Sequence, residues 1–229
     1  MTNTMAEGKI TPTEEKDPQF WKTLASSEIK KRILEKTNRK LGKAKNIIMF
    51  LGDGMALNTI TAARIFKGQS QGKTGEESTI YFQQFPSLGL SKTYCANAQV
   101  ADSACTATAY LGGVKTNIFM LGVTAEVNYN NCSASMDPAN HVSSLAAWAQ
   151  AAGKSTGIIT TTTLTHASPS GTYGHVANRM WECDTDIQNY GDYSNAEECL
   201  DLAQQLIRKG ELRPESFLSS TSNDVSSAI

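Results

Sequence analysis

Val-Ala-Asp-Ser-Ala-Cys-Thr-Ala-Thr-Ala-Tyr, from Val100 to Tyr110, is the most informative stretch of the sequence. Asp102 and Ser103 come directly before a run of small residues that favours a helix. A serine at a helix N-terminus lies among unpaired backbone N–H groups at the positive end of the helix dipole, and both favour an alkoxide or a phosphoryl oxygen. An Asp-Ser pair is also an ordinary helix cap. This stretch alone therefore leaves a nucleophile and a cap as alternatives.

A second segment combines an apolar run with an acidic turn. Lys45–Leu51 reads Lys-Asn-Ile-Ile-Met-Phe-Leu and is followed by Gly-Asp-Gly-Met. The run predicts a buried parallel strand over Asn46–Leu51, and Asn58–Phe66 predicts a helix. Asp53 would then lie at the carboxyl end of the strand, where ligands bind in open α/β sheets, with little side-chain bulk around it. The alternative is an ordinary turn in which Asp53 is a turn residue.

A third polar set follows a segment rich in β-branched residues. Ser155–Thr163 predicts another strand, His166 and Ser168 come soon after it, and Arg179 follows. The planar guanidinium of an arginine matches two phosphate oxygens. Taken singly, His166 could be a hydrogen-bonded loop residue and Arg179 a surface charge. Three such sets, each after a β-rich segment, favour one common site.

These residues resemble the alkaline phosphatases, and most closely the animal tissue-type branch. Residues 100–115 follow the family's nucleophile pattern almost throughout, which reads Val-x-Asp-Ser-Ala-x-Thr-Ala-Thr-Ala-Tyr-Leu-x-Gly-Val-Lys. Residues 50–55 resemble the family's first metal-ligand segment, and residues 166–179 its magnesium and phosphate segment. The resemblance extends from about Phe20 to Arg208. It implies an α/β fold, a three-layer sandwich with a mostly parallel central sheet, here incomplete.

The resemblance also implies a reaction, the hydrolysis of phosphate monoesters through a phosphoserine. Ser103 would be the nucleophile, and Asp102 beside it would orient Arg179. Arg179 would clamp two nonbridging phosphate oxygens. Because a serine is a weak nucleophile at its ordinary pKa, it needs a metal or a base to activate it.

The same resemblance implies Zn²⁺ and Mg²⁺ as cofactors. Asp53 would bridge one zinc and the magnesium, Ser103 would contact a zinc, Ser168 would enter the magnesium shell, and His166 would lie beside it. None of the chain's three histidines matches a zinc ligand of the family, whose C-terminal half supplies those ligands. Since zinc usually takes about four nitrogen, sulfur or carboxylate ligands, we expect a truncated phosphatase, about half of the whole enzyme.

Composition divides the chain into three parts. Residues 1–19 and the Ser-rich tail at 211–229 are too polar to bury a core and are expected to be disordered. Residues 20–210 are expected to form the N-terminal part of the phosphatase domain. Three further helices are expected: Phe20 to about Lys40, His141 to Ala152, and Asn195 to Lys209.

Five cysteines cannot all pair within the chain. By resemblance, Cys132 and Cys199 form a disulfide, and Cys105 is expected to be a buried, inert thiol. The pairing of Cys95, Cys105 and Cys183 is open on the sequence alone.

Several features concern partners and location. The net charge of −1 suggests no nucleic-acid partner. Asn131-Cys-Ser is an acceptor triplet for N-glycosylation, and it suits a secretory protein together with the disulfide. The family is extracellular or anchored to the plasma membrane by a lipid, and its members are homodimers. This sequence opens without an apolar signal region and has no hydrophobic tail for an anchor. The helix that begins near Phe20 could pack at a dimer surface or on its own core.

Two classes of function follow. The first is a zinc- and magnesium-dependent phosphomonoesterase. The second is an inactive fragment that binds phosphate weakly or associates with a full-length relative. A sulfatase would need its nucleophile within a Cys/Ser-x-Pro-x-Arg motif, and neither Ser103 nor Cys105 lies in such a motif.

Overall fold

The computed structural model describes residues 18–37, 42–190, 199–209 and 217–219. The chain divides after Leu90 into two compact units. Residues 20–210, which were expected to form the N-terminal part of the phosphatase domain, fall in both units, and that domain assignment stays a prediction. Of the helices that the structure describes, none is long and apolar enough to cross a membrane.

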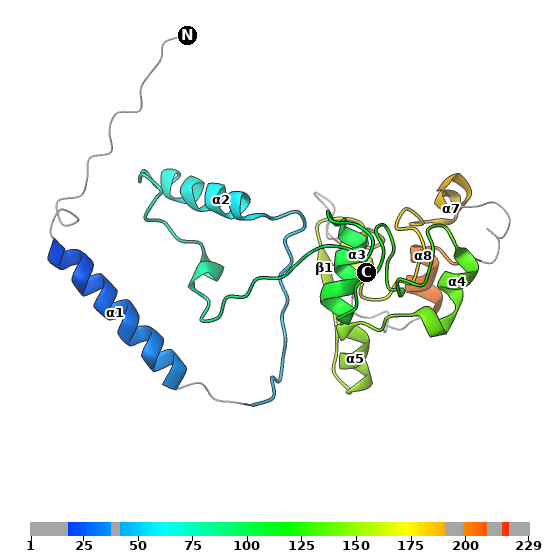
Figure 1. Cartoon of the computed structure of the whole chain (residues 1–229), viewed down its shortest axis with the longest axis horizontal. Helices are drawn as coiled ribbons and strands as arrows, with labels where there is room; N and C mark the ends of the chain where they lie inside the picture. Colours follow the sequence, from blue (N-terminus) through cyan, green and yellow to red (C-terminus); the bar gives the residue numbers. More distant parts are fainter. Residues whose placement is uncertain (1–17, 38–41, 191–198, 210–216, 220–229) are drawn as a thin grey trace, which may run out of the picture. The chain divides into compact units, whose positions relative to one another are not determined.

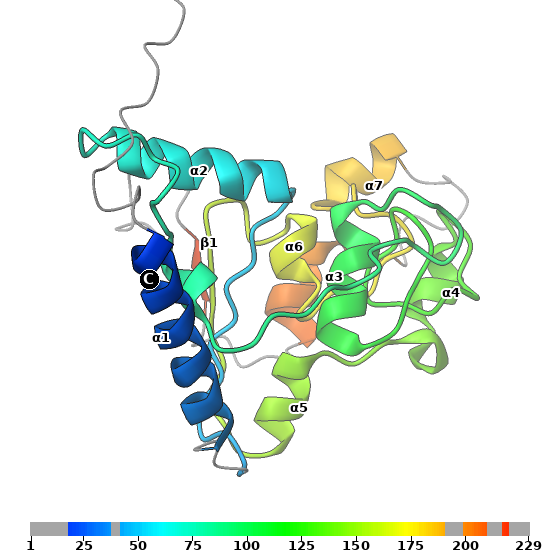
Figure 2. The same ribbon diagram turned by 60° about the vertical axis from the view of Figure 1, so that its left-hand side comes forward.

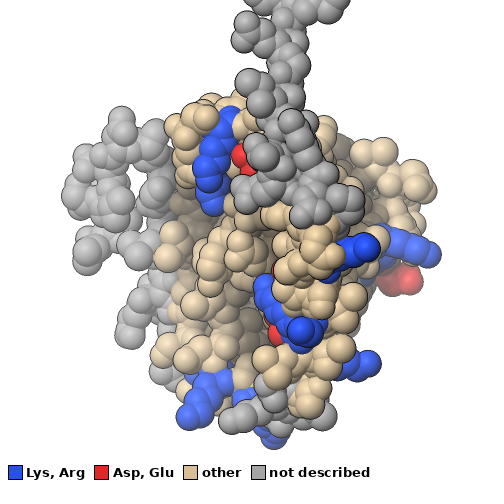
Figure 3. Space-filling model, turned by 90° about the vertical axis from the view of Figure 1, so that its left-hand side faces the viewer, with Lys and Arg blue, Asp and Glu red and all other residues tan. Residues whose placement is uncertain are grey.

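Among its described residues, the first unit contains two helices and one short 3₁₀ turn. They are α1 (Pro18–Thr37), α2 (Leu57–Gln69) and η2 (Tyr81–Gln84). Both expected helices of this unit are confirmed, although residues 38–40 at the expected end of α1 lie outside the described residues. Most large apolar side chains of α1 are exposed, and Trp21 is an example. In the face shown in Figure 3, Lys and Arg side chains lie in several separate places.

The prediction of a strand over Asn46–Leu51 is wrong. This segment is described and has no strand structure, and Ile48 and Phe50 are 79% and 89% exposed. A strand requires a neighbouring strand to which its backbone groups can hydrogen bond. In the described part of the chain, the sheet consists of two other strands. The apolar run predicts burial, but it does not show which segment would pair with it as a neighbouring strand.

The second unit contains eight short helical elements and a two-stranded sheet among its described residues (Figures 1 and 2). The helical elements are α3 (Ser103–Gly112), α4 (Cys132–Met136), η3 (Pro138–Asn140), α5 (Leu145–Ala151), α6 (Ala167–Ser170), α7 (Asp184–Tyr190), α8 (Leu202–Gln204) and the π-helical turn η4 (Gln205–Lys209).

The sheet pairs β1 (Ile158–Thr160) with β2 (Phe217–Ser219) in parallel, with Ile158 opposite Phe217. β1 lies inside the strand expected over Ser155–Thr163, so that strand is confirmed in its central part. β2 lies inside the tail at 211–229 that was expected to be disordered. α1 begins at Pro18, inside the range 1–19 that was also expected to be disordered. The remainder of both expected disordered termini falls outside the described residues.

Two expected helices begin later than the sequence suggested. His141 forms an isolated antiparallel bridge with Val123, and α5 begins only after Ser144, whose hydroxyl accepts the Ala147 N–H at 3.2 Å. The last helix likewise begins after a cap, since Asp201 accepts the Gln204 N–H at 2.7 Å. Residues 195–198 of the expected helix lie outside the described residues. In both cases a local cap, which satisfies an otherwise unpaired N–H, sets the start.

The core of the second unit lies between α3, α6 and the loops around them. α3 and α6 pack closely (Figure 2), and a Cβ on Gly171, which ends α6, would lie 2.6 Å from the Cβ of Ala107 in α3. Only glycine fits at such a distance. The buried apolar residues are Ala104, Ala107, Met120, Leu121, Val123, Val127, Ala167, Tyr173, Val176, Ala177, Trp181, Ile187, Cys199 and Leu202.

Two disulfides stabilise this unit. Cys132–Cys199 is confirmed, and it closes a separation of 67 residues. The expectation that Cys105 is a free thiol is wrong, because Cys105 is bonded to Cys95 with their Cα atoms 5.7 Å apart. That Cα separation is ordinary for a disulfide, and it arises because the loop before α3 folds back on the helix. Cys183 is free and exposed.

Leu202 tests the core. We expect Leu202→Ala to lower the free energy of unfolding by about 2–5 kcal/mol, because the side chain is fully buried and its removal leaves a cavity. Ile207→Ala is the matched control, since Ile207 is 77% exposed, and its effect should stay within about 0.5 kcal/mol. Urea unfolding followed by tryptophan fluorescence measures both changes. Equal effects of the two variants would contradict this description of the core.

Candidate active site

Asp102 directly precedes α3 and caps it. Its backbone is extended (φ −103°, ψ 175°), and its carboxylate accepts the backbone N–H groups of Ala104 at 3.0 Å and Cys105 at 3.3 Å. These two donors are among the four that a helix start leaves unpaired. Ser103, the first residue of α3, is half-buried beside this cap. The capping interpretation of the Asp-Ser pair is therefore confirmed.

The same carboxylate binds Arg179. Nη1 of Arg179 lies 3.0 Å from Oδ2 of Asp102, and the two side chains are only 16% and 11% exposed. Oδ1 of Asp102 also accepts the Phe119 N–H at 3.1 Å, and the Phe119 carbonyl accepts the Arg179 N–H at 2.8 Å. Phe119 has φ +65°, a left-handed conformation that is uncommon outside glycine. The backbone of Phe119 thus bridges both members of the ion pair.

His166 extends this group on the other side of the guanidinium. Nη2 of Arg179 donates to Nε2 of His166 at 3.2 Å. An imidazole that accepts at Nε2 carries its proton at Nδ1 when it is neutral. Nδ1 is buried without a hydrogen-bond partner among the described residues. His166 therefore presents a buried donor that an additional acceptor, such as a water molecule, would satisfy.

Ser168 lies in α6, two residues after His166, and is half-buried. Because α6 packs on α3, the helices that carry Ser168 and Ser103 are neighbours. The structure thus joins Asp102, Arg179 and His166 by direct contacts, and it places Ser103 and Ser168 on the adjoining helices. The interpretation of Arg179 as an isolated surface charge is wrong.

Asp53 belongs to the first unit. It occupies a turn after Leu51, is exposed, and is followed by Gly54 with φ +66°. The turn is closed by a hydrogen bond from the Met55 N–H to the Gly52 carbonyl at 3.2 Å. The turn interpretation of this segment is confirmed. The metal role of Asp53 stays a prediction, because Asp53 belongs to the first unit and the other proposed site residues belong to the second.

The sequence did not indicate Glu182. One oxygen of its carboxylate accepts the hydroxyls of Thr163 at 3.1 Å and Thr165 at 2.6 Å, the latter directly before His166. Tyr173 donates its hydroxyl to the Leu164 carbonyl at 2.9 Å in the same loop. Burial, and then the charges of Glu182 and Asp201, raise the pKa of Tyr173, so the phenol stays protonated and keeps this bond. No sequence pattern links these residues.

The other two histidines form a separate pair. The rings of His141 and His175 stack with their centroids 3.9 Å apart. Nδ1 of His175 lies 2.6 Å from the Gly122 carbonyl, and Nε2 of His141 lies 2.9 Å from the Ser135 carbonyl. Both rings are therefore in contact with backbone oxygens.

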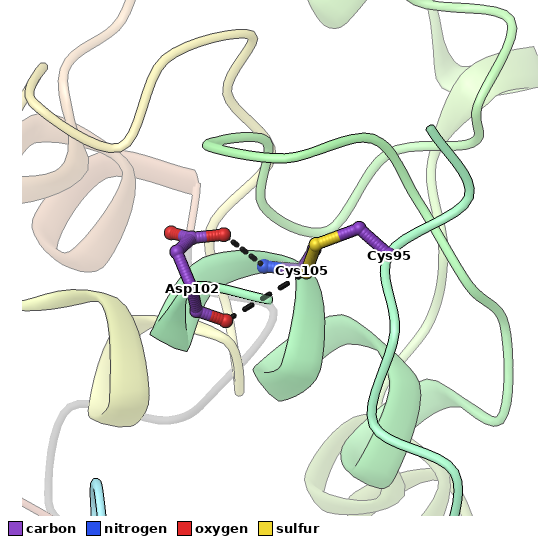
Figure 4. A group of neighbouring side chains, drawn as sticks. All are labelled: Cys95, Asp102 and Cys105. Atoms are coloured by element: carbon purple, nitrogen blue, oxygen red, sulfur yellow. Dashed lines mark hydrogen bonds between the residues drawn. A yellow bond between two sulfur atoms is a disulfide. The ribbon is translucent and has the colours of Figure 1, made fainter. Parts of the chain in front are cut away.

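Cys95, Asp102 and Cys105 bring two sulfurs and a carboxylate within 4.8 Å of one another (Figure 4). Such a set could suggest a metal site. However, the two sulfurs are bonded to each other, and a cysteine binds a metal as the thiolate. This cluster is therefore a covalent anchor beside Asp102 and not a metal centre.

The sequence is similar to known proteins. Residues 44–213 match the family model described as alkaline phosphatase. The chain is 53% identical to a membrane-bound alkaline phosphatase of Bombyx mori over 85% of its own length, and 45% identical to the human tissue-nonspecific isozyme over 89%. It spans 35% and 38% of the length of those two relatives.

Among solved structures, the alkaline phosphatase of the Antarctic bacterium TAB5 is 29% identical. The match covers 60% of this chain and 35% of that protein, with a TM-score of 0.45. The cold-active enzyme of Shewanella sp. is 25% identical over 70% of this chain and 39% of that one, with a TM-score of 0.47. The family match alone covers well over half of the sequence, and on that ground the chain belongs to the alkaline phosphatase family.

Proposed function

We propose that this chain supplies the nucleophile and the phosphate clamp of a phosphate monoester hydrolase. Membership of the alkaline phosphatase family supports this proposal. The observation that carries it is the largely buried Asp102–Arg179 ion pair at the start of α3, next to Ser103. Because the chain spans little more than a third of its curated relatives, the activity of a whole enzyme is part of the proposal.

Ser103 performs the first step. Its Oγ loses the hydroxyl proton and attacks the phosphorus of the ester, the new Oγ–P bond forms, and the bond to the leaving oxygen breaks. The leaving oxygen takes up a proton and departs as the alcohol. Water then hydrolyses the phosphoserine and releases phosphate. The start of α3 assists both steps, because its N–H groups and dipole favour negative charge at the nucleophile and at the bound phosphoryl oxygens.

Arg179 orients the phosphoryl group. Asp102 holds the guanidinium through Nη1, and the remaining N–H groups of the fork are directed at two nonbridging oxygens. His166 contacts Nη2 and so limits the rotation of the same fork. Phosphoryl transfer depends mostly on such positioning and on neutralising charge. The ion pair therefore keeps Arg179 ready before substrate arrives.

Zn²⁺ and Mg²⁺ are proposed cofactors. When bound, these ions neutralise charge on the phosphoryl group and lower the pKa of a serine hydroxyl or a water. Asp53, Ser103 and Ser168 are the proposed ligands. The buried, unsatisfied Nδ1 of His166 fits a position beside a metal shell better than direct ligation, because this nitrogen carries a proton.

Three wider features are also proposed. The fold of the complete protein is a three-layer sandwich with a mostly parallel sheet, and the parallel β1–β2 pair supports this architecture. The functional unit is a homodimer, and the exposed apolar side chains of α1 support a contact there. The protein is extracellular or membrane-attached, in keeping with its two disulfides.

The second candidate is a non-catalytic fragment that binds phosphate weakly or associates with a longer relative. The exposed apolar run Ile47–Leu51 favours it, because such a surface is suited to a partner. Counting bound zinc in the purified chain and assaying an aryl phosphate distinguish the two candidates. Two bound zinc ions together with turnover support the enzyme. The absence of both bound zinc and turnover supports the non-catalytic fragment.

Ser103→Ala tests the nucleophile. We expect the variant to form no phosphoenzyme, because alanine has no oxygen to phosphorylate. Acid-quenched protein incubated with substrate, analysed by intact mass and peptide mapping, detects the modification. Ser143→Ala changes an exposed serine and should leave the phosphoenzyme intact. A phosphoserine that persists in Ser103→Ala would overturn the assignment.

Arg179 tests the clamp. Arg179→Ala should lower kcat/KM for an aryl phosphate by an amount equivalent to about 2–4 kcal/mol, because both fork hydrogen bonds to phosphate are lost. Arg179→Lys keeps the charge without the fork and should recover only part of the loss. Arg32→Ala, which removes an exposed guanidinium, is the control. A kcat/KM unchanged in Arg179→Ala would exclude this residue from substrate binding.

Glycosylation of Asn131 tests the proposed extracellular or membrane-attached location. This exposed side chain caps α4 through Oδ1, which leaves Nδ2 as the attachment atom. When the chain is secreted from animal cells, we expect an N-glycan that an endoglycosidase removes, with a fall in mass. Ser133→Ala should abolish the glycan while it keeps Asn131, and Asn128→Gln should not. A secreted chain whose mass the endoglycosidase does not change would contradict this expectation.

A further inference from the structure

The disulfide between Cys95 and Cys105 lies directly beside the proposed nucleophile. Cys105 is in the first turn of α3, two residues after Ser103, and its N–H donates to Asp102. Figure 4 shows this hydrogen bond on one side of Cys105 and the bond to Cys95 on the other. Both cysteines are buried, each with 2% exposure. The turn that presents Ser103 is thus attached covalently to a segment outside the helix.

That segment is itself held firmly. The Cys95 N–H donates to the Ala98 carbonyl at 3.0 Å, and the Ala96 N–H donates to the Thr116 carbonyl at 2.8 Å. Oδ1 of Asn97 accepts the Ile118 N–H at 2.8 Å. The segment 95–98 therefore contacts the first turn of α3 through the disulfide, and residues 116–118, which follow α3, through hydrogen bonds.

Lys115 adds a further attachment. Its ammonium donates to the carbonyl of Lys92 at 2.9 Å and also to that of Tyr94, and it lies 3.9 Å above the centre of the Tyr94 ring. Residues 92–98 and 115–118 thus form one bracket around α3. The bracket leads to Phe119, whose N–H is bonded to Asp102 and whose carbonyl is bonded to the Arg179 N–H.

We propose that the Cys95–Cys105 disulfide is a positioning element for phosphoryl transfer, which fixes the Asp102–Ser103 turn against the backbone that holds Arg179. This inference rests on the proposed function of Ser103. The disulfide acts through two neighbours of the reacting group, Asp102 and the first turn of α3, and does not contact the substrate. Because a displacement of about 1 Å at a reacting group can cost about 100-fold in rate, a covalent anchor two residues away has a large effect.

The two disulfides of the chain provide a matched comparison. Cys95→Ala/Cys105→Ala removes the bracket disulfide, and Cys132→Ala/Cys199→Ala removes the other, which closes a longer loop at α4. Hydrogen exchange followed by mass spectrometry on the full chain reports local order without any activity. We expect faster exchange in peptides that cover residues 102–106 and 118–119 in the first variant only. Unchanged exchange in these peptides would overturn the proposal.

Turnover is measured on the same proteins and expressed per Ser103 that becomes phosphorylated, so that a loss of folded protein does not count. We expect kcat to fall about 10- to 100-fold in Cys95→Ala/Cys105→Ala with KM almost unchanged. The control variant should keep kcat per phosphorylated site. An unchanged kcat beside faster exchange would overturn the catalytic part. Faster exchange in Cys95→Ala/Cys105→Ala, together with a wild-type chain that forms no phosphoserine, would instead show that the proposed function fails while the structural role of the disulfide stands.

Discussion

The carboxylate of Asp102 is the group on which the site depends. It satisfies two N–H groups of the first turn of α3, accepts the Phe119 N–H and pairs with Arg179. An ionised carboxylate has about four positions for hydrogen bonds, and a half-buried one is costly unless these are filled. One side chain therefore joins a helix start, a strained backbone residue and a distant cation. Removing it would leave the two helix N–H groups and the Phe119 N–H without this acceptor, and Arg179 without its anionic partner.

Features set by neighbouring residues could be predicted from the sequence. The start of α3 follows from Asp102 and the small residues after it, because a cap and a helix propensity act within a few positions. α2 and the central part of the strand at Ile158–Thr160 follow for similar reasons. The pairing of Asp102 with Arg179 spans 77 residues and needed the family resemblance, since no local pattern connects them.

Features that depend on a distant partner could not be predicted. The run Asn46–Leu51 has the composition of a buried strand, yet a strand exists only when another segment pairs with it. Cys105 occupies a position typical of a small buried residue, and only the fold-back of the preceding loop brings Cys95 to it. Glu182 binds the two threonines before His166 from 17 and 19 residues away. Each of these contacts is a consequence of the tertiary fold.

The order of residues along the chain has a consequence for biosynthesis. Cys95 and Cys105 leave the ribosome close together, and a ten-residue separation closes at small entropic cost. The start of α3 can therefore be cross-linked while Arg179 is still being translated. During that interval the Asp102 carboxylate has its helix donors but no cation. The emergence of residue 179 then supplies the cation that pairs with this carboxylate, beside a helix start that is already cross-linked.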